Sequence, residues 1–479
     1  MVQPTMSNLP RLTPSAISHL RAAGHDRVAG VLIGSALGDT IGLYTEFLSA
    51  TTCAAAYPTK RFTLTGNGTQ SGPTPFKLDA HRAPKEQGHW TDDTDHALLL
   101  LLAYLHTAFA PGGGDASGVE LPTQGGGRFP TQQDVAARLR VWVAQGFRPL
   151  DTMPLGLGRL VGSVVASAGF AEDPESVARG YWERTGKRVA PNGSLMRTHS
   201  LGVMCYSVAQ DEAFALAASI SRVTHVDPRC VVACVIGTGL VRALVKGGVE
   251  AGVIGEKEVD ELVEKAVEWY QQKGRNEADG ELDLDELWRH VKPEGGLDDL
   301  KLDDRAAMGY VYKTLGSGIV LLRMAIRRRG ESRGGLLDRS RVFEDLITDL
   351  IMRGGDADTN ACFAGALLGG YLGYSSLPDH WKHGLKHEKW LLGKADAVSQ
   401  VLGLKDGDEY RGKLDPDTDV QGGKPEISQD EMEGRWMVLQ QNTFKMMEAV
   451  AKADASRAVA SKGSGSRWSL PWPNKDKKP

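Results

Sequence analysis

Two short clusters of oxygen-donor side chains are the strongest chemical feature of this sequence. The first lies in "GHWTDDTDHALLLLLAYL" and contains Thr91, Asp92 and Asp93. The second lies in "MRGGDADTNACFAGALLGGYLG" and contains Asp356, Asp358 and Thr359. Each cluster directly precedes a strongly apolar stretch, so each is predicted to stand at the start of a buried helix.

Helix capping and cation binding are both open interpretations of these clusters. Asp and Thr are favoured N-cap residues, worth about 1 kcal/mol, and acids suit the first turn of a helix. One cap needs only one side chain, however, whereas each cluster supplies two carboxylates and a hydroxyl. Four carboxylates brought together would repel each other or take up protons. Oxygen donors without neighbouring His or Cys suit Mg²⁺ or Mn²⁺ rather than zinc, and this many could hold two ions, which orient substrate oxygens and activate water.

The elements that position these clusters carry small residues at steps of four. One stripe is Gly30, Gly34, Gly38 and Gly42; the other is Ala361, Gly365, Gly369 and Gly373. Residues four apart share one face of a helix. Because glycine costs a helix interior up to about 1 kcal/mol, a repeated glycine face indicates that two backbones approach closely. We therefore predict two crowded, buried helices near each other.

The remaining apolar pattern predicts an all-α fold, a single large multi-helix domain with inserted loops and a C-terminal extension. Helices are expected at 134–147, 211–222, 229–246, 305–328 and 341–352. The predicted organisation is a flexible N-terminal lead (1–24), the main domain (25–404, with insertions at about 63–87, 111–128 and 255–304) and a C-terminal part (405–479). The third insertion should include an amphipathic helix. The C-terminal part reads as a linker, a helix opened by a capping box of Ser428 and Glu431, and a basic tail with Trp468 and Trp472 as docking points.

Bulk composition excludes some classes of function. The 479 residues carry a net charge of -4 with an isoelectric point near 6.3, which gives no reason to expect nucleic-acid or membrane binding. The five cysteines contain no CxxC pair and are predicted to be reduced, buried thiols in a cytoplasmic or nuclear protein. The acid-poor first residues also resemble a mitochondrial presequence, although a disordered lead is the favoured interpretation. We expect a monomer.

Five motifs together resemble the ADP-ribosylglycohydrolase family, which includes the enzyme that releases ADP-ribose from dinitrogenase reductase. They are "GVLIGSALGDTIGLYTEF", "GHWTDDTDHA", "PNGSLMRTHSLG", "SRVTHVDP" and "RGGDADTNACFAGALLGGYLG", in family order from about Asp26 to Trp381. The resemblance implies an all-helical domain with two Mg²⁺ ions (Mn²⁺ in some members) in a cleft. It also implies hydrolysis at the anomeric carbon of the distal ribose in ADP-ribosyl conjugates: protein-linked ADP-ribose, poly(ADP-ribose) or small derivatives.

Motif matching carries the family's roles onto individual positions. The implied ion ligands are Thr91, Asp92, Asp93, Asp356, Asp358 and Thr359, with Asp358 bridging the two ions. Glu46 matches a glutamate on a mobile loop and is a candidate metal-coordinating gate or general acid. Asp93 or another ligand carboxylate would take the proton of the attacking water, and the sequence does not choose between them.

Further matches concern the substrate. Gly156 and Gly158 resemble a glycine segment near the diphosphate, whereas Asn192, Gly193 and Ser194 resemble a ribose- and phosphate-contacting loop, with His225 near both groups. The simpler alternatives are an ordinary Asn-Gly turn and a helix-start histidine. Met196 and Arg197 are expected to pack or pair behind the loop, and Asp95 and His96 to lie outside the ion ligands.

One departure from the family pattern concerns the leaving group, the residue or compound to which ADP-ribose is linked. Arginine-specific relatives tend to carry an aspartate in the glycine segment, where this chain has "LGLGR". This favours serine-linked or other oxygen-linked substrates, or free ADP-ribose derivatives. Two other hypotheses are a catalytically silent ADP-ribose-binding or structural family member, and a two-metal phosphohydrolase that cleaves the diphosphate.

Overall fold

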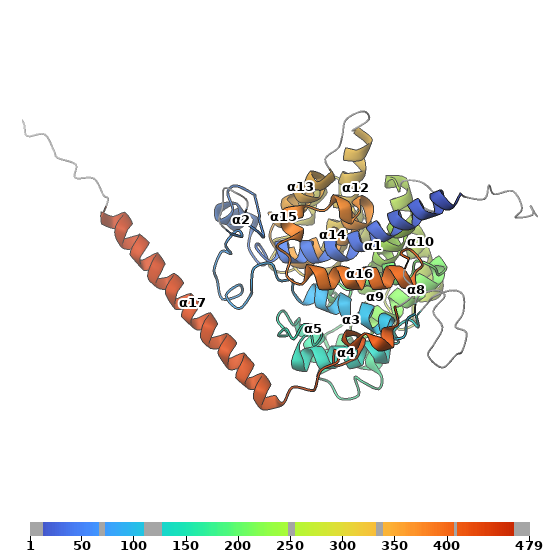
Figure 1. Ribbon diagram of the computed structural model, residues 1–479, viewed down its shortest axis with the longest axis horizontal. Helices are drawn as coiled ribbons and strands as arrows, with labels where there is room; N and C mark the ends of the chain where they lie inside the picture. The colour runs from blue at the N-terminus through green and yellow to red at the C-terminus, as the bar shows by residue number, and fades with distance from the viewer. Residues whose placement is uncertain are drawn as a thin grey trace, which may run out of the picture. The chain divides into compact units, whose positions relative to one another are not determined.

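The apolar periodicity of the sequence is realised as a succession of helices in the computed structural model (Figure 1). The structure describes residues 13–66, 72–109, 127–247, 254–331, 339–406 and 410–463. Within these ranges the α-helices are α1 (Pro14–Gly42), α2 (Ala50–Ala56), α3 (Asp92–His106), α4 (Gln132–Gln145), α5 (Arg159–Val165), α6 (Pro174–Arg184), α7 (Thr198–Met204), α8 (Gln210–Arg222), α9 (Pro228–Lys246), α10 (Glu256–Trp269), α11 (Leu284–Val291), α12 (Val311–Glu331), α13 (Arg339–Ile351), α14 (Ala357–Leu372), α15 (Asp379–Lys382), α16 (Glu388–Val401) and α17 (Gln429–Gly463). Short helical turns are η1 (Asn192–Ser194), η2 (Tyr270–Gly274), η3 (Gly296–Leu300), η4 (Tyr374–Ser376), η5 (Gly412–Leu414) and η6 (Pro416–Thr418). The described residues form isolated β-bridges but no strand, so the all-α prediction is confirmed.

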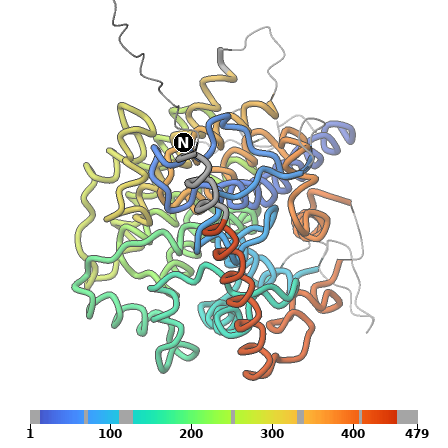
Figure 2. Tube along the Cα trace, turned by 90° about the vertical axis from the view of Figure 1, so that its left-hand side faces the viewer, coloured from blue at the N-terminus to red at the C-terminus, as the bar shows by residue number. Residues whose placement is uncertain are grey.

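The two glycine-bearing helices pack directly against each other at the centre of the fold. In Figures 1 and 2 the blue helix α1 runs next to the orange helices α14 and α16. A Cβ atom built on Gly34 would lie 2.5 Å from the backbone oxygen of Gly365, and one on Gly38 would overlap the oxygen of Ala361. Any side chain would force these backbones apart. The predicted close approach is therefore confirmed.

Longer apolar helices complete the core around this pair. Helix α9 is the one described helix that could cross a membrane by length and composition, and 83% of its apolar window is buried inside the protein. It contacts α7, α8, α10 and α14, as a core helix does. The predicted amphipathic helix of the third insertion is α10, whose apolar residues are buried. All five cysteines are buried thiols, as expected.

Two predicted boundaries were wrong. Helix α1 begins at Pro14, where Thr13 caps it, so residues 14–24 belong to a helix and not to a flexible lead. Helix α12 begins at Val311 and not at 305, because 305–310 form turns.

The segment 410–426, predicted as part of a linker, is packed onto the main domain. Arg138 donates hydrogen bonds to the backbone oxygens of Thr418 (2.5 Å) and Asp419 (3.2 Å), and Thr418 is fully buried. Lys394 forms an ion pair with Asp415 at 2.7 Å. The Gly, Pro and Asp residues here make tight turns, which composition alone does not separate from a linker.

The chain divides into two units, Met1–Pro75 with Gln87–Glu426, and Phe76–Glu86 with Ile427–Pro479. In the second unit, Arg82 forms an ion pair with Asp79 at 2.5 Å. Helix α17 starts after Ser428, whose hydroxyl accepts a hydrogen bond from the Glu431 N–H at 3.2 Å. The expected lead residues 1–12, most of the 111–128 insertion, and Trp468 and Trp472 lie outside the described residues.

Candidate active site

The central helix pair brings the two donor clusters together. At the end of the seam, a Cβ atom on Gly42 would lie 2.5 Å from the Ala357 oxygen and 2.6 Å from the Asp358 nitrogen, so α1 ends against the first turn of α14. Carboxylate oxygens gather here in two groups, each within 4.8 Å: Asp39, Asp93 and Asp358 form one, and Glu46, Asp356 and Asp358 form the other. Asp358 belongs to both groups.

Asp39 is a buried member of this cluster that the sequence reasoning missed. Its carboxylate accepts hydrogen bonds from the Thr91 N–H (3.0 Å), the Thr94 N–H (3.1 Å) and the Thr94 hydroxyl (2.6 Å). Asp39 therefore caps α3 from the neighbouring helix α1. The hydroxyl of Thr91, at the N-cap position, does not cap and instead donates to Asp93 at 3.0 Å. A signal was present, because Asp39 is the only charged residue between Val28 and Leu43.

The next residues of α3 fix its orientation. Both oxygens of the buried Asp95 accept indole hydrogen bonds, from Trp90 at 2.8 Å and from Trp142 at 2.9 Å. His96 is also buried and meets the Trp142 ring edge-on, with centroids 4.4 Å apart. Both residues lie outside the donor cluster and hold its helix in place.

The electrostatics of the cluster suit a cation. Burial, with the neighbouring carboxylates, raises the pKa of Asp93 and of Asp358 well above the usual range. Burial and then Glu46 raise the pKa of Asp356 to about 6. Within the described part of the chain no Lys or Arg forms an ion pair with these three carboxylates, and Asp93 Oδ1 is buried without a hydrogen-bond partner. These oxygens fit a hard divalent cation, which would replace the repulsion by coordination.

Asn192 connects the second donor cluster to the substrate loop. Its amide nitrogen donates to Asp356 at 2.8 Å and to Thr314 at 2.9 Å, and the Thr314 hydroxyl donates to Asn360 at 2.7 Å. The Asn192 backbone N–H donates to the Gly309 oxygen at 3.0 Å. Asn192 thus fixes the Asp356 carboxylate and joins η1 to the turn before α12.

The loop that carries Glu46 is tied down in this structure. The Phe47 N–H donates to the Gly355 oxygen at 2.6 Å, the Gly355 N–H donates to the Leu48 oxygen at 2.9 Å, and Thr45 donates to the Ile351 oxygen at 2.7 Å. Glu46 is 6% exposed. The resemblance to the family implied a mobile loop at this position. In this structure, backbone hydrogen bonds hold the loop against the second donor cluster.

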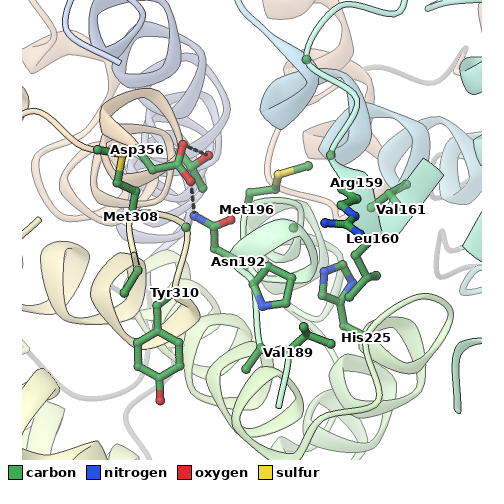
Figure 3. Close-up of a pocket in the computed structure, with 18 of the residues that line it drawn as sticks. Arg159, Leu160, Val161, Val189, Asn192, Met196, His225, Met308, Tyr310 and Asp356 are labelled. Atoms are coloured by element: carbon green, nitrogen blue, oxygen red, sulfur yellow. Dashed lines mark hydrogen bonds between the residues drawn. The ribbon is translucent and has the colours of Figure 1, made fainter. Parts of the chain in front are cut away.

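Residues of both donor clusters, with Glu46 and Asn192, line one cavity of about 830 Å³. Figure 3 shows Met308, Tyr310 and Asp356 on one side of Asn192, with Arg159 and His225 on the other. The predicted site residues that line the cavity are Glu46, Asp92, Asp93, Gly156, Gly158, Asn192, Gly193, His225, Asp356, Asp358 and Thr359. Thr91 and Ser194 lie behind its wall. Ser194 is fully buried and forms hydrogen bonds with Ser221 and Cys234.

The two glycines of the "LGLGR" segment differ in their surroundings. Gly156 has φ +102, and a Cβ atom there would overlap the carboxylate of Asp92. Gly158 has ordinary backbone geometry, and a Cβ atom there would meet nothing within 4 Å. Close approach therefore requires glycine only at the first position.

The sequence reasoning also missed three exposed arginines that line the cavity, Arg159, Arg188 and Arg305. In the described chain none of them has an ion pair or a side-chain hydrogen bond. Unpaired guanidinium groups beside a cavity suit an anionic ligand such as a phosphate. Arg159 directly follows the glycine segment, but Arg188 and Arg305 stand in no recognisable motif.

Fold and site together define an all-α protein with a carboxylate cluster suited to a divalent cation beside an arginine-lined cavity. The sequence profile of a family described as ADP-ribosylglycohydrolase matches residues 20–408, most of the chain. The chain therefore belongs to the ADP-ribosylglycohydrolase family, a hydrolase family that acts on ADP-ribosylated substrates.

Among solved structures, one described as "ADP-ribosylglycohydrolase-related protein complex" is 21% identical. The match covers 80% of this chain and 98% of that chain, with a TM-score of 0.47. Comparison with curated proteins finds no match.

Proposed function

We propose that this protein hydrolyses the glycosidic bond at the distal ribose of ADP-ribosyl conjugates and releases ADP-ribose, with two Mg²⁺ (or Mn²⁺) ions as cofactors. The observation that carries the proposal is the convergence of carboxylates from α1, α3 and the start of α14 at one cavity. The unpaired arginines of the same cavity support a substrate that also bears phosphate.

The proposed ion ligands are Thr91, Asp92, Asp93, Asp356, Asp358 and Thr359. Bound ions would hold the vicinal hydroxyls of the distal ribose and lower the pKa of water. The membership of Asp358 in both carboxylate groups supports a bridging position for it. The Asn192 amide would hold the Asp356 carboxylate in place as ions enter.

The protein residues would then move the protons. Asp93, with its unpartnered Oδ1, is the proposed acceptor for the proton of the attacking water. Glu46, on the same cavity wall, would either coordinate or protonate the leaving oxygen. Since the segment of Gly156 and Gly158 contributes no aspartate, we propose an oxygen-linked substrate, such as ADP-ribosylserine, rather than an arginine-linked one.

The test is a product assay with the purified full chain and Mg²⁺. Arginine-, serine- and acetyl-linked ADP-ribose compounds and poly(ADP-ribose) would be supplied separately and the products identified by mass. We expect ADP-ribose from an oxygen-linked compound, loss of turnover in Asp358→Asn, and wild-type turnover in the exposed control Gly393→Ala. AMP as the product would indicate a phosphohydrolase instead. Binding of ADP-ribose without any turnover would indicate a catalytically silent family member.

A further inference from the structure

The two ring nitrogens of His225 differ, because only Nδ1 has a hydrogen-bond partner among the described residues. It follows α8, is 2% exposed, and lines the cavity (Figure 3). Its Nδ1 lies 2.7 Å from the Thr224 hydroxyl. Its Nε2 has no hydrogen-bond partner among the described residues, and a Cβ atom on Gly193 would lie 3.2 Å from it. Nε2 is therefore buried beside Gly193, and any side chain at 193 would press on this edge of the ring.

A chain of hydrogen bonds determines which atom donates in the contact between the Thr224 hydroxyl and His225 Nδ1. Arg197 can only donate, and its Nη2 lies 2.8 Å from the Thr224 oxygen. The Thr224 hydroxyl therefore accepts from Arg197 and keeps its own hydrogen to donate. The other hydrogen-bond contact of that hydroxyl among the described residues is with His225 Nδ1, so the hydrogen is donated there. Nδ1 is then the acceptor of the ring, and the single proton of the neutral imidazole lies on Nε2.

The surroundings keep the ring neutral and the arginine charged. Burial, with Arg197 and His96 nearby, lowers the pKa of His225 well below its usual value. Burial lowers the pKa of Arg197 to about 10, so it remains a cation near neutral pH. Arg197 is fully buried, forms no ion pair in the described chain, and has Nε and Nη1 without hydrogen-bond partners. Its positive charge therefore adds to a potential that favours an anion in the cavity.

We propose that Arg197 and Thr224 are positioning residues that hold His225 in its Nε2–H form, so that His225 donates a hydrogen bond to an anionic oxygen of the ligand. The identity of that ligand, a phosphate oxygen of ADP-ribose, rests on the proposed function. The tautomer does not, because it follows from contacts inside the protein alone.

The first experiment reads the tautomer without any ligand. The full chain is labelled with ¹⁵N-histidine, and the two ring nitrogens of His225 are assigned by loss of their signals in His225→Gln. We expect a protonated Nε2 and a hydrogen-bonded, unprotonated Nδ1 in the wild type. Thr224→Val should remove the hydrogen-bond shift at Nδ1 and Thr224→Ser should restore it. A proton on Nδ1 in the wild type, or an unchanged Nδ1 signal in Thr224→Val, overturns the proposal.

The second experiment measures ADP-ribose affinity by calorimetry. Hydrogen bonds to charged groups are worth more than neutral ones, so a misplaced donor should weaken binding by roughly 3- to 10-fold in Thr224→Val. Thr224→Ser should bind within about twofold of wild type, since it restores the hydroxyl. His225→Gln, with an amide donor at the ε position, should bind more tightly than His225→Asn.

The matched control is Thr238→Val, because Thr238 is a buried threonine of α9 whose hydroxyl has no partner in the described chain. It should leave both the His225 signals and the affinity unchanged. Wild-type affinity in Thr224→Val would overturn the role in ligand binding. If the wild type does not bind ADP-ribose, the proposed function fails. The tautomer measurement still decides whether Arg197 and Thr224 hold His225 in its Nε2–H form.

Discussion

Substituting Gly42 tests whether the helix seam sets the geometry of the ion site. A Cβ atom at Gly42 would lie 2.4 Å from the Asp358 Cα, whereas ordinary contact begins at 3.4 Å. Gly42→Ala therefore requires a displacement of about 1.0 Å between the end of α1 and the first turn of α14. Because Asp358 stands in that turn, its carboxylate must move away from Asp39 and Asp93.

The expected magnitudes follow from this overlap. Overpacking costs about 1–3 kcal/mol, and the gain from replacing glycine by alanine in a helix offsets at most about 1 kcal/mol of that. Displacing a ligand's support typically weakens metal binding by about 10- to 100-fold. Urea unfolding in metal-free buffer would measure the stability of Gly42→Ala, and calorimetric titration with Mg²⁺ its ion affinity.

Two matched variants separate stability from ion binding. In Gly30→Ala the new Cβ would lie 2.9 Å from the nitrogen of Tyr374 and would overlap Gly369, so the stability loss should be similar. Gly30 lies about 18 Å from Gly42 along α1, so its ion affinity should match wild type. Gly393→Ala adds a methyl group to the exposed face of α16 with nothing within 4 Å, and should be neutral or stabilising. Equal Mg²⁺ affinity in Gly42→Ala and Gly30→Ala would refute the reasoning.

Four further predictions concern single residues around the site. Asp358→Asn should be more stable than wild type in metal-free buffer, because it removes a repelling carboxylate. It should lose the stabilisation that Mg²⁺ gives the wild type, about 2.7 kcal/mol at an Mg²⁺ concentration of 100 times the Kd. A full Mg²⁺ response of this variant in urea unfolding would contradict this. Asp39→Asn should cost about 1–3 kcal/mol and weaken Mg²⁺ binding in calorimetry, since an amide cannot accept on both atoms at the start of α3. Asp95→Asn leaves one buried indole N–H unsatisfied and should cost about 1–3 kcal/mol in urea unfolding followed by tryptophan fluorescence; wild-type stability would show that the two indole bonds contribute little. Gly156→Ala should impair Mg²⁺ binding and stability, whereas Gly158→Ala should do neither; equal effects in both assays would disprove the distinction.

Local pattern was sufficient to predict the central pair of helices. Glycine at every fourth position has few explanations in a chain of this composition other than close helix packing, so the α1–α14 contact followed from spacing. The donor clusters were also found from residue type, because two carboxylates and a hydroxyl exceed what a single helix cap requires. Where segments were rich in Gly, Pro and Asp, as at 410–426, composition failed, since tight packed turns and linkers use the same residues.

Asp39, Arg197 and the unpaired arginines of the cavity required tertiary structure. Asp39 caps a helix that begins 53 residues later, and nothing local indicates which backbone amides it meets. The proton position on His225 depends on Arg197, the residue before α7, through one hydroxyl group.

The sequence by itself determined the helices, the close approach of two of them and the chemical type of the donors, because these depend on periodicity and on side-chain chemistry. Only the tertiary structure decided which oxygens share a space, which cations stay unpaired and which ring nitrogen of His225 has a hydrogen-bond partner. Those properties depend on distances between segments far apart in the chain, and a distance between such segments exists only after the chain has folded.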